Sequence, residues 1–312
     1  MIRHALLAGA MLCLVAAPLA ASDISVPAYP ETRAEQVVET QFGEDIADPY
    51  RWLENDVRND PEVAQWVERQ NQATGAVLAQ LPARDWFKAR IAALTDYERF
   101  GIPRKAGSNY FYTRNSGLQN QSQLFVQAGL EGERRLLIDP NAWAADGATA
   151  LSDWQPSENG RLLAYSVQDG GTDWRIIRVL DVETGEPLGD EIRWAKFTSI
   201  AWVGNEGFLY SRFPAPEEGQ DFQALNYNQA VWFHRIGTPQ SEDVLVFATP
   251  DRPELGHGAE VSDDSRWAVM TSWVGTDAKY DIHVIDLAAR ARDGWKAWNH
   301  RGLVSGVEGF SA

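Results

Sequence analysis

The sequence holds few residues that could carry out covalent chemistry. A serine hydrolase presents its nucleophile on a sharp strand-to-helix turn flanked by glycines, as in the pattern Gly-x-Ser-x-Gly. This pattern is absent from all 312 residues, and Gly309-Phe310-Ser311-Ala312 matches only its beginning. Because acyl transfer needs a nucleophile, a base and a group that orients the base, the sequence predicts no catalytic residue of its own.

Histidines and paired carboxylates are the other candidates for chemistry. The five histidines lie at positions 4, 234, 257, 283 and 300. His234 and His283 fall in strand-like runs, where histidine is more often structural than catalytic, and His257 is expected in a loop. Glu217-Glu218 and Asp263-Asp264 could bind a metal, but adjacent acids in a turn are more often solvated. We therefore expect neither a metal site nor a cofactor.

The overall charge limits the possible partners. The formal net charge is −16 and the isoelectric point is about 4.7. Binding to nucleic acid or to an anionic membrane requires a basic surface, so neither is expected as a partner. The hydrophobic share of 44% is ordinary for a globular protein and excludes global disorder.

Residues 1–21 have the pattern of a secretory signal peptide. Arg3 supplies the positive start, residues 5–17 form the apolar core, and small residues allow cleavage after Ala21. The core is too short to span a membrane as a helix. Cys13, the only cysteine, lies inside this segment, so the mature chain would carry neither a disulfide nor a thiolate metal site. We expect a periplasmic or secreted protein.

Residues 22–96 are expected to form a helical segment. Asp48 is predicted to cap a short helix, and Asp60-Pro61 to begin an amphipathic helix that ends near Leu81. A third helix is predicted over 84–94. Its inward-facing residues are expected to be Trp86, Phe87 and Ile91. The rest of the sequence offers no obvious partner for these apolar faces.

The remaining part, residues 97–312, repeats one pattern of strands. In residues 152–185, the dipeptide Asn159-Gly160 predicts a two-residue hairpin turn, and the nearly continuous apolar runs 162–167 and 175–182 predict strands covered on both faces. Similar pairs of runs occur four times: 109–114 with 123–127, 161–167 with 175–182, 206–213 with 230–237, and 266–273 with 281–288.

The spacing of these pairs favours a β-propeller over a sandwich. Equivalent positions at Tyr112, Tyr165, Tyr210 and Met270 are separated by 53, 45 and 60 residues. This fits the period of propeller blades, about 40–50 residues, lengthened by loops. One window alone would also suit two hairpins of a sandwich. We expect a mainly β protein with about four blades.

Several specific motifs resemble the N-terminal part of the prolyl oligopeptidase family, which are serine peptidases that cleave short peptides after proline. The resemblance runs from about Tyr29 to the last residue. The matching segments are 48–54 (DPYRWLE), 115–121 (NSGLQNQ), 171–174 (GTDW), 195–202 (AKFTSIAW), 237–244 (GTPQSEDV) and 258–264 (GAEVSDD). The related oligopeptidase that cuts after basic residues shares part of the first motif, but 115–121 favours the prolyl branch.

This resemblance implies a two-domain enzyme. A seven-bladed propeller caps the active site and admits only short proline-containing peptides, and the N-terminal helices pack on a C-terminal α/β-hydrolase domain. This sequence contains no counterpart of the hydrolase domain, and it reaches about the fourth blade. As it stands, the chain is therefore expected to be inactive and poorly stable. The alternative function is a free-standing propeller that binds peptides or proteins without catalysis.

The resemblance also implies substrate-lining residues in the propeller. Phe197 matches a phenylalanine that lines the family's peptide pocket, although it could instead be core between blades. Ile285 stands where some members carry cysteine and is expected to line the pocket too. Gly256 departs from the family because it replaces a larger side chain, which leaves the detailed substrate preference open.

Overall fold

The computed structural model describes residues 24–145, 147–170, 172–292 and 298–308, so the predicted signal peptide and the segment 309–312 lie outside the described residues. The chain divides into two compact units, and the boundary in the sequence falls between Ile91 and Ala92. This division falls inside a helix that ends at Thr95, next to the predicted boundary after residue 96. No helix in the described ranges is long and apolar enough to cross a membrane.

The first unit contains a small hairpin followed by helices. Its elements are β1 (Val38–Gln41), β2 (Glu44–Ala47), the 3-10 helix η1 (Arg51–Glu54), α1 (Pro61–Leu78) and α2 (Arg84–Thr95). The carboxylate of Asp60 accepts hydrogen bonds from the backbone N–H groups of Glu62 (2.8 Å) and Val63 (3.3 Å). These donors have no partner inside the helix, so the predicted start of α1 at Asp60-Pro61 is confirmed.

Two predictions for this segment are wrong. Asp48 does not cap a helix, because η1 begins only at Arg51, and the Asp48 carboxylate instead accepts from Nε of Arg51 at 2.5 Å. The side chains of Trp86, Phe87 and Ile91 on α2 are exposed rather than inward-facing. Helical spacing correctly predicted an apolar face, but it could not show whether the described chain covers that face.

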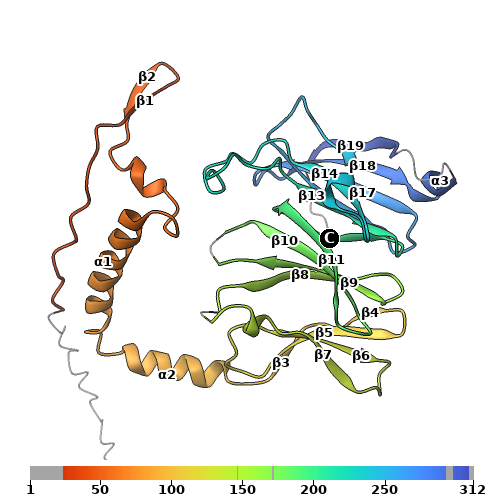
Figure 1. The fold of residues 1–312 in the computed structure, drawn as a ribbon, viewed down its shortest axis with the longest axis horizontal. Coiled ribbons are helices and arrows are strands. Elements are labelled where there is room, and N and C mark those ends of the chain that lie inside the picture. The colour runs from red at the N-terminus through yellow and green to blue at the C-terminus, as the bar shows by residue number, and fades with distance from the viewer. Residues whose placement is uncertain (1–23, 146, 171, 293–297, 309–312) are drawn as a thin grey trace, which may run out of the picture. The chain divides into compact units, whose positions relative to one another are not determined.

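The described residues between 99 and 308 form a five-stranded, an eight-stranded and a four-stranded antiparallel sheet. The eight-stranded sheet has two halves, so four units follow one another along the chain, and we call them blades 1 to 4 (Figure 1). Blade 1 consists of β3 (Arg99–Phe100), β4 (Arg104–Ala106), β5 (Asn109–Asn115), β6 (Gln123–Ala128) and β7 (Arg134–Ile138). Blade 2 consists of β8 (Ala150–Pro156), β9 (Leu162–Gln168), β10 (Arg175–Asp181) and β11 (Pro187–Ala195). Blade 3 consists of β12 (Ala201–Val203), β13 (Gly207–Arg212), β14 (Ala230–Arg235) and β15 (Val244–Phe247). Blade 4 consists of β16 (Leu255–Val261), β17 (Trp267–Val274), β18 (Lys279–Asp286) and β19 (His300–Glu308).

Short helices complete the described chain: η2 (Pro140–Ala142), η3 (Gln240–Glu242) and α3 (Leu287–Arg292). A single backbone pairing, Ala195 with Arg212, joins the sheets of blades 2 and 3.

The four predicted strand pairs are confirmed. The four equivalent positions each have a partner on the next strand: Tyr112 faces Phe125, Tyr165 faces Arg178, Tyr210 faces Trp232, and Met270 faces His283. The turn between β8 and β9 differs from the predicted two-residue hairpin turn. Five residues, 157–161, separate β8 from β9, and of the Asn159-Gly160 pair only Gly160 has a positive φ, 72°. A side chain at Gly160 would collide with the carbonyl oxygen of Ala106, so this position requires glycine.

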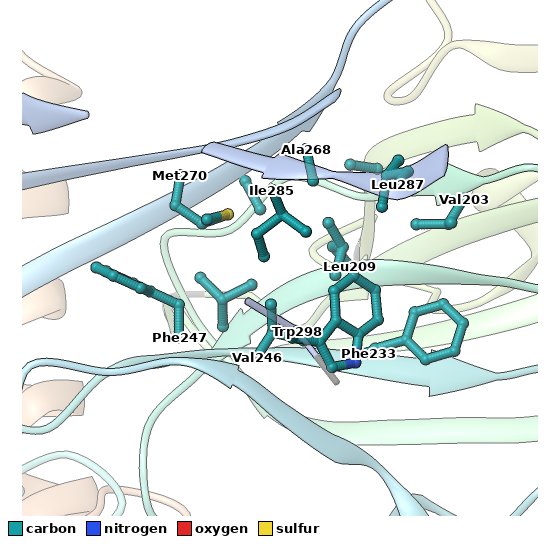
Figure 2. Packing of buried hydrophobic residues seen from close by; sticks show 13 residues of the cluster. Val203, Leu209, Phe233, Val246, Phe247, Ala268, Met270, Ile285, Leu287 and Trp298 are labelled. Carbon is teal, nitrogen blue, oxygen red and sulfur yellow. The ribbon is translucent and has the colours of Figure 1, made fainter. Parts of the chain in front are cut away.

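Apolar residues fill each space between neighbouring blades. One buried cluster lies between blades 1 and 2, a second between blades 2 and 3, and a third between blades 3 and 4. Figure 2 shows the third, where Leu209 and Phe233 of blade 3 face Met270 and Ile285 of blade 4. Neighbours on one strand serve opposite clusters, so both faces of blades 2 and 3 are covered. This stacking is that of a propeller and not of a two-sheet sandwich.

Candidate functional site

Several connections between strands, including the long β13–β14 connection, gather at one end of the sheets. The pairing of Ala195 with Arg212 places the end of β11 beside the end of β13. The Ser211 hydroxyl donates to the carbonyl oxygen of His257 (2.7 Å), which adds the start of β16 to the same end. By antiparallel register, the β5–β6, β9–β10, β11–β12, β13–β14 and β17–β18 connections all lie here. Three of the motifs that suggested the family, 115–121, the described part 172–174 of the second, and 195–202, therefore share this end, which we call the Phe197 end.

Phe197 lies two residues after the end of β11 in an unusual backbone conformation. Its φ is 52°, and Trp194 nearby in the same segment has a φ of 62°. This left-handed region is unfavourable for residues with a side chain and persists only where the surroundings enforce it. The side chain of Phe197 is 46% exposed. The alternative interpretation, that Phe197 is core between blades, is therefore wrong.

Aromatic rings pack around Trp174 and contact the residues next to Phe197. The rings of Trp194 and Phe213 meet the ring of Trp174 edge-on, with centroids 5.5 and 6.3 Å away. The Trp174 indole N–H donates to the carbonyl oxygen of Asp221 (2.7 Å), so the ring is also tied to the β13–β14 connection. Nζ of Lys196 lies 4.9 Å from the centre of the Trp174 ring, within cation–π range. Trp174 thus contacts both Trp194 and Lys196 in the segment around Phe197, and its own ring is fixed by a hydrogen bond.

Ile285 and Gly256, the other two positions compared with the family's peptide pocket, differ from Phe197 in their surroundings. Ile285 is 1% exposed and belongs to the cluster between blades 3 and 4, so it offers no surface to a peptide in the described chain. Its role in lining the peptide pocket stays a prediction, which this burial does not support. Gly256 pairs with Trp273 on β17. A Cβ atom at Gly256 would lie 3.3 Å from Cε2 of Trp273, so the indole occupies the space that a larger side chain would need.

His257 lies in β16 and not in a loop, so that prediction is wrong. Its side chain is fully buried, with Nδ1 2.8 Å from Oγ of Ser272 and Nε2 3.1 Å from Oγ1 of Thr249. Burial, with a smaller effect from the nearby His283, lowers the pKa of His257 to about 4. A histidine beside a serine could suggest a nucleophile and its base. Both groups are closed to substrate, however, and their strands belong to the core of blade 4, so this pair is structural.

His234 is also structural, as predicted from its position in a strand. Its Nδ1 lies 2.7 Å from Oδ1 of Asp243, and its Nε2 lies 3.0 Å from Oδ1 of Asp190. Burial by itself lowers the pKa of His234, but hydrogen bonds from its ring to Asp190 and Asp243 outweigh this effect and raise the pKa to about 9. The ring is therefore a charged link between β11 and β14. With both ring nitrogens engaged, it has no role in catalysis or in metal binding.

No third ligating side chain joins either pair of carboxylates in the described part of the chain. Glu217, Glu218, Asp263 and Asp264 are exposed, as expected for solvated turn residues. Among the described residues, no group of three or more histidine, cysteine or acidic side chains is arranged to hold a metal ion.

Sequence reasoning missed the contacts of Trp174, Lys196 and Gln229 in the segment around Phe197, and the contact of Trp273 with Gly256 and Gly258. One signal was available for Trp273. Gly256 and Gly258 alternate along β16 and so share one face, and a pair of glycines on one face of a strand indicates that a large neighbouring side chain lies across them.

The stacked antiparallel sheets define a β-propeller domain. A profile described as "Prolyl oligopeptidase, N-terminal beta-propeller domain" matches residues 29–310. The chain therefore belongs to the prolyl oligopeptidase family and corresponds to its N-terminal propeller.

Individual relatives agree with this assignment. The chain is 35% identical over 271 residues to a prolyl endopeptidase of Elizabethkingia meningoseptica, which covers 87% of this chain and 38% of that one. It is 30% identical over 301 residues to the dual function macrocyclase-peptidase POPB of Galerina marginata, with 87% and 40% covered.

Solved structures give the same result. One from an analysis of two prolyl endopeptidases is 49% identical, has a TM-score of 0.61, and covers 89% of this chain and 39% of that chain. Prolyl oligopeptidase B of Galerina marginata, bound to a 35mer hydrolysis and macrocyclization substrate, is 27% identical with a TM-score of 0.68 and covers 83% and 39%. The chain thus spans about two fifths of the length of these relatives.

Proposed function

We propose that this propeller is part of a periplasmic or secreted serine-type endopeptidase that hydrolyses short peptides after proline. In this proposal, a C-terminal α/β-hydrolase domain supplies the nucleophile, base and oxyanion donors, and the propeller limits access to them. The proposal is supported by the family membership and by relatives that are prolyl endopeptidases.

The observation that carries the substrate part of this proposal is the placement of Phe197. A large aromatic side chain is half-exposed at the end of the sheets where these connections gather, and its backbone is held in a costly conformation. Strain of this kind is often retained at ligand-binding sites. An exposed aromatic ring also suits the flat, apolar ring of proline and its neighbours. Phe197 is therefore the residue that we assign to the peptide pocket.

The exposed face of α2 supports the presence of the hydrolase partner. Trp86, Phe87, Ile91 and Leu94 recur at helical spacing and are all more than half exposed. Covering one such side chain contributes roughly 1.5–3 kcal/mol, so this face is a favourable docking surface for a second domain.

Hydrolysis of a Gly-Pro reporter tests the proposal. We expect turnover by the complete polypeptide that contains this chain and none by residues 22–312 alone, since the latter lack a nucleophile. Failure of the complete polypeptide to turn over the reporter would contradict the enzyme assignment. Binding of proline peptides by residues 22–312, without any hydrolysis by the complete polypeptide, would instead support a free-standing binding module.

Export is tested separately by the N-terminus of the mature protein. Cleavage after Ala21 leaves Ser22 as the first residue, which mass spectrometry of exported material would detect. An intact Met1 on exported protein would contradict this part of the proposal.

A further inference from the structure

Gln229 is a buried amide, immediately before β14, that contacts two other parts of the propeller. Its side-chain Nε2 donates to the carbonyl oxygens of Lys196 (2.8 Å) and, more weakly, Phe197 (3.4 Å). Its Oε1 accepts from the backbone N–H of His257 at 2.6 Å. The N–H group can only donate and the carbonyl groups can only accept, so the orientation of the amide follows from its partners. With 2% exposure, Gln229 makes these bonds out of contact with water.

The two carbonyl groups that Gln229 contacts lie on either side of the Cα atom of Phe197. The Lys196 carbonyl belongs to the peptide plane before Phe197, and the Phe197 carbonyl belongs to the plane after it. Fixing the orientations of both planes fixes φ and ψ of Phe197. Because the left-handed conformation of Phe197 needs support from its surroundings, Gln229 is the side chain placed to provide it.

His257, the partner of Oε1 of Gln229, is itself held by several hydrogen bonds. The Ser211 hydroxyl donates to the carbonyl oxygen of His257, and the His257 ring is hydrogen-bonded to Ser272 and Thr249. His257 is fully buried, so its position is set by the packing of blade 4 against blade 3. Gln229 therefore connects the segment around Phe197 to β16, the first strand of blade 4.

We propose that Gln229 is a positioning residue for peptide binding. It holds Phe197 in its left-handed conformation and sets the position of this aromatic wall relative to blade 4. The effect on peptides rests on the proposed function of Phe197, whereas the effect on the loop does not. Gln229 acts through Phe197 and touches no reacting group.

Trypsin cleavage tests the effect on the loop, because the bond between Lys196 and Phe197 is a trypsin site. In the complete polypeptide we compare Gln229→Leu, which removes all of the hydrogen bonds, with Gln229→Glu at pH 9, where the ionised carboxylate keeps an acceptor for His257 but has no donor for the two carbonyl groups. We expect cleavage after Lys196 to be at least tenfold faster in both variants. Thermal melting establishes whether each variant is folded. If Gln229→Leu does not fold, Gln229→Glu alone still tests the effect on the loop.

Gln168→Leu is the matched control. The amide of Gln168 donates to the carbonyl oxygen of Thr172 (2.7 Å) in the neighbouring β9–β10 connection, so this variant removes a similar bond at the same end of the sheets. Its cleavage after Lys196 should stay within twofold of the wild-type rate. Equal rates for folded Gln229→Glu and the wild type would overturn the proposal.

Kinetics test the effect on peptides. For a Gly-Pro reporter we expect Gln229→Glu to raise KM at least fivefold with kcat within twofold, and we expect no further increase in a double variant with Phe197→Ala. A lower kcat at unchanged KM would overturn the positioning role. If the wild-type polypeptide shows no turnover, the proposed function fails, and the cleavage rates still decide whether Gln229 holds the Phe197 segment.

Discussion

Nδ1 of His234 lies 2.7 Å from Oδ1 of Asp243, and neither side chain is accessible to water. The second carboxylate, on Asp190, lies 3.0 Å from Nε2 on the other side of the ring. Asp243 also accepts a hydrogen bond from the hydroxyl of Tyr210 at 2.5 Å. This buried network joins blade 2 to blade 3 through charge as well as through apolar contact.

Replacing His234 with glutamine should strongly destabilise the propeller. Removing one member of a buried ion pair leaves a charge without compensation, and the usual cost is about 3–5 kcal/mol. Urea unfolding of His234→Gln measures this loss. His300→Gln, at an exposed histidine, is the control and should change the free energy of unfolding by less than about 0.5 kcal/mol. A loss below about 1 kcal/mol for His234→Gln would show that the network contributes little.

The stability of the propeller should fall on both sides of a maximum near pH 6.5, because two histidines respond to pH in opposite directions. The pKa of His234 is raised from 6.5 to about 9, so its stabilising effect is complete below pH 6.5 and is lost as the pH rises through 9. The pKa of His257 is lowered to about 4, so its effect is complete above pH 6.5 and is lost as the pH falls through 4.

Unfolding free energies measured from pH 4 to pH 10 test this expectation. The difference between the wild type and His234→Gln should shrink above pH 6.5, and the difference between the wild type and His257→Gln should shrink below it. Differences that do not vary with pH would contradict the assigned charge states.

Substitution of Phe197 should cost little stability. Phe197→Ala is expected to lower the free energy of unfolding by less than about 1 kcal/mol because the ring is half-exposed, whereas Phe208→Ala, at a fully buried ring, should cost about 3–5 kcal/mol. Phe197→Gly should be at least as stable as Phe197→Ala, since glycine adopts the left-handed conformation without strain. Thermal and urea unfolding measure all three. A large loss for Phe197→Ala would mean that the ring packs in the core after all.

A methionine at Gly256 should collide with its neighbours. A Cβ atom there would lie 3.3 Å from Cε2 of Trp273 and 3.4 Å from Oε1 of Gln229, so we expect a cost of roughly 1–3 kcal/mol from overpacking. Adding Trp273→Ala should recover part of this loss. Gly75→Ala is the control, because no atom lies near that position and alanine favours helix α1. An unchanged melting temperature for Gly256→Met would show that Trp273 moves aside freely.

Local patterns in the sequence were enough to predict the strands and the class of domain. Alternating and continuous apolar runs are local properties, so the four central strand pairs and the start of α1 at Asp60 were correctly predicted. The repeat of the pairs indicated a propeller because each sheet needs neighbours on both faces. The motifs at 115–121 and 195–202 indicated the family, since several specific segments occur in the same order.

The contacts of the buried polar residues became evident from the folded chain alone. Asp190 is 44 residues from His234, and Gln229 is 33 residues from Lys196 and 28 from His257, so no local pattern predicts these contacts. The position of His257 was misjudged because glycines on both sides of it weaken the signal of a strand. Those glycines are explained by the indole of Trp273, which comes close to both from the neighbouring strand. The side chains that hold Phe197 acquire their role through long-range packing, which arises only when the blades are stacked.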